Sequence, residues 1–100
     1  MKKFYGGIFI EKEKLKEAGI VKPIKLEYYK ITNEEEEKYG IEIVKKQYIN
    51  EEIKVENKEI DYITNNEEKI DEILRILKEN EVTPIAVQDV ICDFSKEILM

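Results

Sequence analysis

The sequence predicts an α+β fold in which a small antiparallel sheet of three to four strands is followed by two C-terminal helices packed on one face. Between residues 24 and 64 apolar residues alternate with charged ones, as in strands with one solvated face. Between residues 66 and 99 apolar residues recur every three or four positions, the spacing of an amphipathic helical pair. No low-complexity spacer interrupts the 100 residues, so we expect a single domain over 1–100.

Residues 1–23 are predicted to be an N-terminal extension of one strand and one helix. Gly7 to Ile10 forms the strand and Glu11 to Ala18 forms the short helix. Gly19 ends that helix, because glycine readily adopts the left-handed conformation of a helix terminus. The sequence leaves open whether this extension packs on its own domain or swaps between subunits.

The region 24–64 is predicted to hold the antiparallel strands. Two strands, at about 24–32 and about 38–49, are joined by the acidic loop 33–38. In the first strand the apolar positions shift by one between Tyr28 and Tyr29, as if a bulge reversed the two faces. Two shorter strands, 52–56 and 59–64, flank the turn candidate Asn57-Lys58.

A helical pair is predicted over 66–99. The first helix covers 66–79, with Thr64 or Asn65 as its N-cap and Asn80 as a left-handed terminator. Pro84 then separates the two helices, since proline lacks an amide proton and restricts the residue before it to extended conformations. The apolar face of the second helix consists of Val87, Val90, Ile91, Phe94 and Ile98.

The chain lacks the side chains that most enzymes use. It has no histidine, one serine and one cysteine, so neither a Ser-His-Asp nor a Cys-His arrangement can be assembled and we expect no enzyme activity and no cofactor. Cys92 lies beside the apolar stripe of the second helix and is expected to be a buried or half-buried hydrophobe. Asp89 and Asp93 lie one turn apart and could together contact a divalent cation. Two carboxylates provide too few oxygen ligands for a metal site, so a solvated polar face is favoured and a metal-dependent enzyme is a disfavoured alternative.

The net charge and the pattern of apolar residues indicate whether the chain binds nucleic acid, a membrane or protein. A net charge of −6 disfavours nucleic acid, and no apolar stretch approaches the length that a bilayer requires. The single cysteine fits a reducing cytoplasm. We therefore expect a non-catalytic protein-interaction or regulatory module that binds protein, with a homodimer left open. The residues predicted to contact the partner are Tyr29, Tyr48, Thr83, Pro84, Gln88, Asp89 and Asp93.

Two resemblances accompany these predictions. The segments Tyr39 to Ile43, Ile63 to Asn66, Asn80 to Pro84 and Asp89 to Phe94 resemble a family of short uncharacterised proteins of clostridia and related Firmicutes, over about residues 28–94. That resemblance implies a bacterial setting and assigns no activity, cofactor or substrate. Residues 7–27 are locally similar to swapped-hairpin transition-state regulators, which dimerise and bind DNA. This similarity implies, as an alternative, a DNA-associated regulator with a swapped N-terminal dimer.

Overall fold

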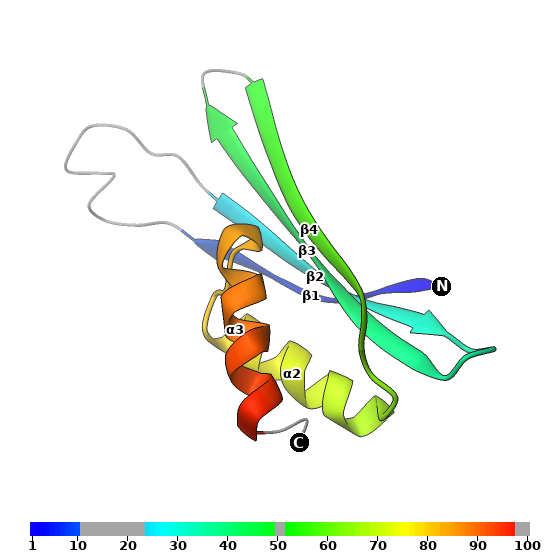
Figure 1. Cartoon of the computed structure of the whole chain (residues 1–100). Helices are drawn as coiled ribbons and strands as arrows, with labels where there is room; N and C mark the ends of the chain where they lie inside the picture. Colours follow the sequence, from blue (N-terminus) through cyan, green and yellow to red (C-terminus); the bar gives the residue numbers. More distant parts are fainter. Residues whose placement is uncertain (11–23, 50–51, 98–100) are drawn as a thin grey trace.

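Four antiparallel strands and two helices make up the part of the chain that the structure describes. This computed structural model describes residues 1–10, 24–49 and 52–97. The elements follow one another as β1 (Lys2–Ile10), β2 (Ile24–Asn33), β3 (Lys38–Ile49), β4 (Glu52–Thr64), α2 (Glu67–Glu79) and α3 (Pro84–Glu97). The sheet order is β1-β2-β3-β4, and both helices lie on the same face of the sheet (Figure 1). The predicted α+β fold is confirmed.

The core lies between the helices and one face of the sheet. Alternate residues of β2 and β3 point toward the helices, and the amphipathic stripe of α2 packs against them. The fully buried side chains of this core are Leu26, Tyr28, Ile41, Ile43, Ile70, Ile73, Leu74, Leu77 and Val87. The Tyr28 hydroxyl donates a hydrogen bond of 2.9 Å to the Val82 carbonyl oxygen, which ties the sheet to the connection between α2 and α3.

The strands differ from the prediction at three places. The predicted bulge at Tyr28 and Tyr29 is wrong, because β2 pairs with β3 without a register shift and carries apolar side chains on both faces. Register shifts occur instead in β1, between Phe4 and Gly6, and in the pairing of β3 with β4, between Tyr39 and Ile41. The two short strands predicted at 52–56 and 59–64 are one strand, since Asn57 and its neighbours continue the ladder with β3.

The N-terminal strand is longer than predicted, because it begins at Lys2 rather than at Gly7. Lys2 pairs with Ile31 and Phe4 pairs with Tyr29, so the ladder with β2 continues well beyond the two glycines. The helix predicted at 11–18, with its terminal Gly19, lies outside the described residues. Neither α2 nor α3, the two helices in the described part, is long and apolar enough to cross a membrane.

The N-cap of α2 differs from the predicted residues, whereas its C-cap is Asn80, as predicted, in another conformation. Asn66, rather than Thr64 or Asn65, is the N-cap, and its side-chain oxygen accepts a hydrogen bond from the Lys69 amide. Asn80 has a φ of −96° and is not left-handed, whereas Glu81 has a φ of 52°. The left-handed residue therefore lies one position later, and Pro84 begins α3.

Candidate functional site

The sheet face that points away from the helices is the most distinctive surface of the described residues. We call it the open face. Residues that are opposite each other in the ladders share a face, so its members follow from the register. They are Lys2, Phe4, Gly7, Phe9, Lys25, Glu27, Tyr29, Ile31, Asn33, Lys38, Gly40, Glu42, Val44, Lys46, Tyr48, Ile53, Val55, Asn57 and Glu59.

Large apolar side chains are exposed on the open face. Phe4 and Phe9 belong to β1, Tyr48 belongs to β3, and Ile53 and Val55 belong to β4. Each of these five side chains is between 38% and 60% exposed. Exposed apolar side chains scattered singly are ordinary on proteins, but a set gathered on one sheet face is typical of a surface that contacts another macromolecule.

A first ion pair lies within the open face. The Lys2 ammonium is 2.6 Å from Glu42 Oε1, and Asn57 donates a hydrogen bond of 3.0 Å to Glu42 Oε2. Glu42 is only 5% exposed although no helix of the described part covers it. Burial acts to raise the pKa of Glu42, but the hydrogen bonds from Lys2 and Asn57 and the charge of Lys2 outweigh it, so this pKa lies below its usual value.

A second cluster surrounds Glu27. Its carboxylate lies 3.2 Å from the Lys46 ammonium and 3.5 Å from the Lys25 ammonium, and it accepts a hydrogen bond of 3.4 Å from the Tyr29 hydroxyl. Burial again acts to raise the pKa of Glu27, and the two lysines outweigh it, so the net shift is downward. The Phe4 ring packs edge-on against Tyr29, with the ring centroids 5.5 Å apart.

These contacts leave the two buried carboxylates with partners on the protein itself. A further layer placed over the open face would therefore leave neither of them as an unpaired charge, which is the most costly outcome of burying ionic groups. Lys2 and Lys46 are in turn held in ion pairs with Glu42 and Glu27.

The structure divides the residues predicted to contact a partner between two sides of the sheet. Tyr29 and Tyr48 lie on the open face, where Tyr29 is half-buried and Tyr48 is exposed. The other five, Thr83, Pro84, Gln88, Asp89 and Asp93, belong to α3 and the residue before it, on the helical side. Among these Thr83 is half-buried and Pro84 is buried, whereas Gln88, Asp89 and Asp93 are exposed. Pro84 and Gln88 border a hollow between α3 and β4.

Sequence reasoning missed four exposed apolar residues of the open face: Phe4, Phe9, Ile53 and Val55. A signal for Phe4 and Phe9 exists in the sequence, because both alternating sets of β1 and of its neighbour β2 contain large apolar residues. A strand with apolar residues in both sets has a covered face and a second face that can pack against another surface.

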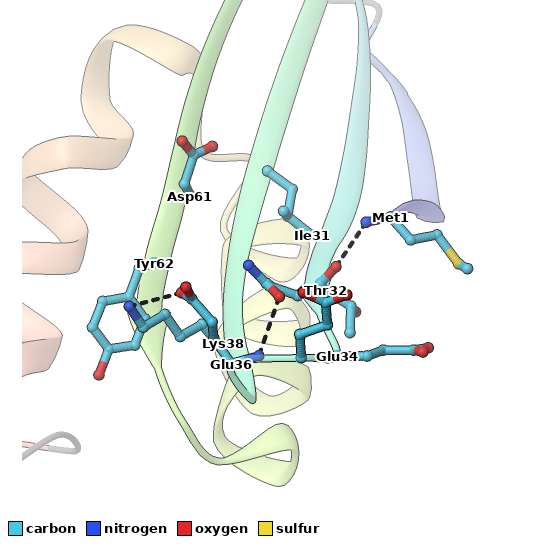
Figure 2. A pocket seen from close by; sticks show the side chains of 10 residues that line it. Met1, Ile31, Thr32, Glu34, Glu36, Lys38, Asp61 and Tyr62 are labelled. Carbon is cyan, nitrogen blue, oxygen red and sulfur yellow. Dashed lines mark hydrogen bonds and ion pairs between the residues drawn. The ribbon is translucent and has the colours of Figure 1, made fainter.

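A hollow beside the acidic turn is lined by residues of β2, β3, β4 and the turn itself (Figure 2). Glu34 and Glu36 face this hollow, and the Lys38 ammonium lies 3.0 Å from Glu36 and over the Tyr62 ring. The Met1 ammonium donates a hydrogen bond of 2.7 Å to the Thr32 carbonyl oxygen. These contacts account for the fold of the turn, and an acidic turn of this kind is an ordinary solvated surface.

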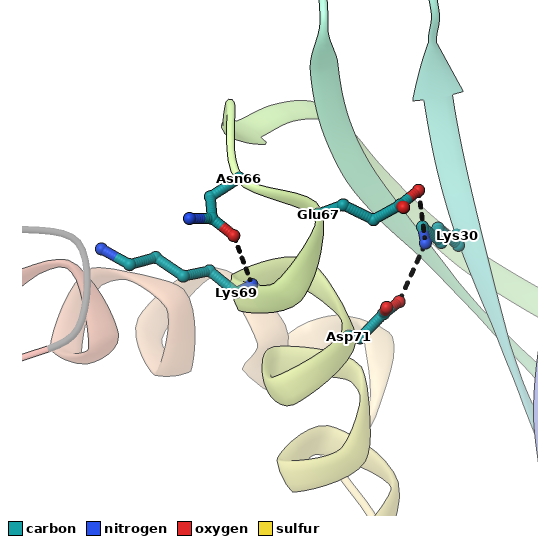
Figure 3. Close-up of polar contacts among 5 residues, drawn as sticks. All are labelled: Lys30, Asn66, Glu67, Lys69 and Asp71. Atoms are coloured by element: carbon teal, nitrogen blue, oxygen red, sulfur yellow. Dashed lines mark hydrogen bonds and ion pairs between the residues drawn. The ribbon is translucent and has the colours of Figure 1, made fainter.

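Ion pairs also fasten the start of α2 to the sheet (Figure 3). The Lys30 ammonium lies 3.1 Å from a Glu67 oxygen and 2.9 Å from an Asp71 oxygen. Burial acts to lower the pKa of Lys30, and the hydrogen bonds that its ammonium donates to Asp71 and Glu67 outweigh it, so the pKa is raised. The acids of the first helical turn also face the positive end of the helix dipole, so this cluster supports the packing of α2.

The helical side shows no assembled chemical centre within the described residues. In that part of the chain no group of three or more His, Cys, Asp or Glu side chains could hold a metal ion. The expectation for Cys92 is wrong, because this residue is exposed. Its neighbour Ile91 is half-buried on the packed side of α3, and the next residue of a helix lies about 100° further around the axis.

The fold and the open face define a two-layer α+β protein with one uncovered sheet surface. The chain belongs to a family of unknown function (DUF6514), whose family model matches residues 7–97. No curated protein and no solved structure matches the chain.

Proposed function

We propose that this chain is a non-catalytic protein-interaction or regulatory module of the cytoplasm whose open face binds a protein partner. The observation that carries the proposal is the group of exposed apolar side chains on that face, drawn from three of the four strands. Aromatic side chains in such a group are frequent anchors of protein interfaces, because they bury a large area at a small cost in side-chain entropy.

The ion pairs of the open face support a protein partner over a polyanion. Lys2 contacts Glu42, and Lys46 contacts Glu27, at 2.6 and 3.2 Å. A phosphate backbone would have to compete with these carboxylates for the ammonium groups. The net charge of −6 adds a repulsive field that salt screens only in part.

Site-specific photo-crosslinking in the producing cells tests the proposal. A photoreactive phenylalanine analogue placed at Tyr48 samples the open face, and the same analogue at the exposed Ile85 on α3 samples the helical side. We expect a discrete protein adduct from position 48 and none from position 85. Equal adducts from both positions, no adduct from position 48, or an adduct with nucleic acid would each overturn the proposal.

A further inference from the structure

We infer that the partner of the open face is a second copy of this chain. The two sheets pack face to face, related by a two-fold axis that lies in the interface and runs across the strands. This inference rests on the proposed function, because it names the occupant of the same face. It is carried by the charges of the open face, their distribution along the strands and the size of the face.

Two acidic chains can approach each other most easily through a neutral surface. The whole chain has a net charge of −6. The ladder places four lysines and three glutamates on the open face: Lys2, Lys25, Lys38, Lys46, Glu27, Glu42 and Glu59. Lys38 is paired at 3.0 Å with Glu36 of the adjacent turn, so the face together with this pair has a net charge of zero. Acidic surfaces of two copies repel each other, so contact through a neutral face has a smaller electrostatic cost than contact through an acidic one.

The charges of the open face cancel in sum but are unevenly distributed along the strands. At one end Lys25 lies opposite Lys46, and both contact Glu27, which leaves an excess of one positive charge. At the other end Glu42 lies opposite Glu59.

Lys2 contacts Glu42 and has an attractive interaction with Glu59. Lys38, at the same end, is offset by its ion pair with Glu36, so this second end has an excess of one negative charge. The open face therefore has a basic end and an acidic end, separated along the direction of the strands.

This distribution selects one symmetric arrangement. A two-fold axis along the strands would place the basic end of one copy over the basic end of the other. An axis across the strands places each basic end over an acidic end, and the favourable contact occurs twice because the interface is isologous. Packed sheets lie about 10 Å apart, a spacing that allows exposed side chains of the two copies to interdigitate.

The size of the open face is sufficient for a stable dimer. Four strands at a spacing of about 4.8 Å, each about ten residues long, present a flat area of roughly 600 Å² before side-chain relief is included. Specific interfaces bury about 800 Å² per partner, which is the same order. Phe9, Ile53 and Val55 near the basic end and Phe4 near the acidic end supply the apolar contacts.

Sedimentation equilibrium of the full chain, over a wide concentration range, tests the dimer. We expect the mass to rise from the monomer value of 11.9 kDa to twice that value. Val55→Lys should raise the dissociation constant at least about tenfold, because it buries an ammonium in the interface. Ile85→Lys, the same change at an exposed aliphatic residue on the helical side, should leave the constant as in the unmodified chain.

Two charge reversals test the orientation. Lys25→Glu gives both ends of the face an excess of negative charge, and Glu59→Lys gives both ends an excess of positive charge. We expect each variant alone to dimerise more weakly by about tenfold, and the mixture of the two to regain the doubled mass as a heterodimer. Circular dichroism confirms that each variant folds. A mixture that dimerises no better than the separate variants would overturn the orientation.

The outcomes also separate this inference from the proposed function. A chain that stays monomeric at every concentration, or a dimer that Val55→Lys does not weaken, would overturn the second copy as occupant. If the photoreactive group at Tyr48 then captured a different protein, the proposed function would stand without the dimer. If it captured no protein, both would fail.

Discussion

Gly40 shows how one residue determines the path of two strands. It is buried in β3, where the pairing with β4 shifts register between Tyr39 and Ile41. A Cβ at this position would overlap the Ile60 carbonyl oxygen and lie 2.5 Å from the Asp61 carbonyl carbon. The close approach of the two backbones therefore requires glycine, for space rather than for a left-handed conformation.

Gly40→Ala is accordingly expected to destabilise the fold by about 3 kcal/mol, the upper end of typical overpacking costs. Gly6→Ala is the matched control, since a Cβ there would meet only the side chain of Lys78, at 3.2 Å from its Nζ, and that side chain can move. Urea unfolding followed by circular dichroism measures both free energies. Equal losses for the two variants would contradict the steric role of Gly40.

Glu42 links a residue-scale contact to the pH dependence of stability. Its pKa is lower in the folded chain than the ordinary value of 4.5, because the contacts with Lys2 and Asn57 outweigh burial. A group with a depressed folded pKa stabilises the fold above its unfolded pKa, and this stabilisation is lost as the pH falls through the folded pKa.

We therefore expect the free energy of unfolding to fall as the pH is lowered below about 4.5. Glu42→Gln should flatten this dependence, because the amide cannot take up the proton. The measurement is a series of urea unfolding curves at one protein concentration and decreasing pH. A variant that keeps the full slope of the unmodified chain would contradict the role given to the Lys2–Glu42 pair.

At the scale of elements, the spacing of apolar residues predicted the bounds of α2 and β3 closely. The residues typical of turns predicted a break in β4 that the structure does not have. The helix expected over 66–79 is observed as Glu67–Glu79, because its apolar stripe is also the stripe that packs on the sheet. The strand expected at 38–49 is observed as Lys38–Ile49. The break expected at Asn57-Lys58 is absent, since the Asn57 amide is used by Glu42 on the neighbouring strand. A local turn signal is thus overridden by a contact that the sequence order does not reveal.

The error in the predicted N-cap of α2 also arises from a contact between residues that are far apart in the sequence. Thr64, Asn65 and Asn66 are all competent N-cap residues, and the choice among them depends on where β4 ends. Thr64 still pairs with Tyr39 in the sheet, so the chain leaves the strand too late for Thr64 to cap the helix. Asn66 then has extended angles, with φ −107° and ψ 115°, and accepts the Lys69 amide hydrogen bond.

Asn66→Ala should therefore destabilise the fold by about 1 kcal/mol, the usual cost of removing an N-cap side chain. Asn65→Ala is the informative comparison, because Asn65 is exposed and precedes the cap, and we expect a clearly smaller loss. Thermal unfolding of the two variants beside the unmodified chain measures the difference. Asn65 also accepts a hydrogen bond from the Tyr62 hydroxyl, so Tyr62→Phe measures the loss of that bond separately. A loss for Asn65→Ala that exceeds both Tyr62→Phe and Asn66→Ala would contradict the capping role of Asn66.

For the whole molecule, the sequence predicted the layers but not which sheet face stays uncovered. In β2, Leu26 and Tyr28 point to one side and Tyr29 and Ile31 point to the other, and both sets are apolar. Which of the two faces the helices cover depends on contacts between residues far apart in the sequence, such as the hydrogen bond from the Tyr28 hydroxyl to the Val82 carbonyl oxygen. The open face, with its basic and acidic ends, consequently emerges only when four strands are aligned in register.

The two layers share one core, so we expect the sheet and the helices to unfold in a single transition. Melting curves from the helical circular dichroism signal and from tyrosine fluorescence should coincide, because Tyr28 is buried against the helical layer. Leu77→Ala, which leaves a cavity in that core, should reduce stability by about 2–5 kcal/mol and displace both curves together. Ile85→Ala, at a side chain that is 79% exposed, should leave both curves in place. Loss of the helical signal at a lower temperature than the tyrosine signal would show instead that the helices are a separate and weaker unit.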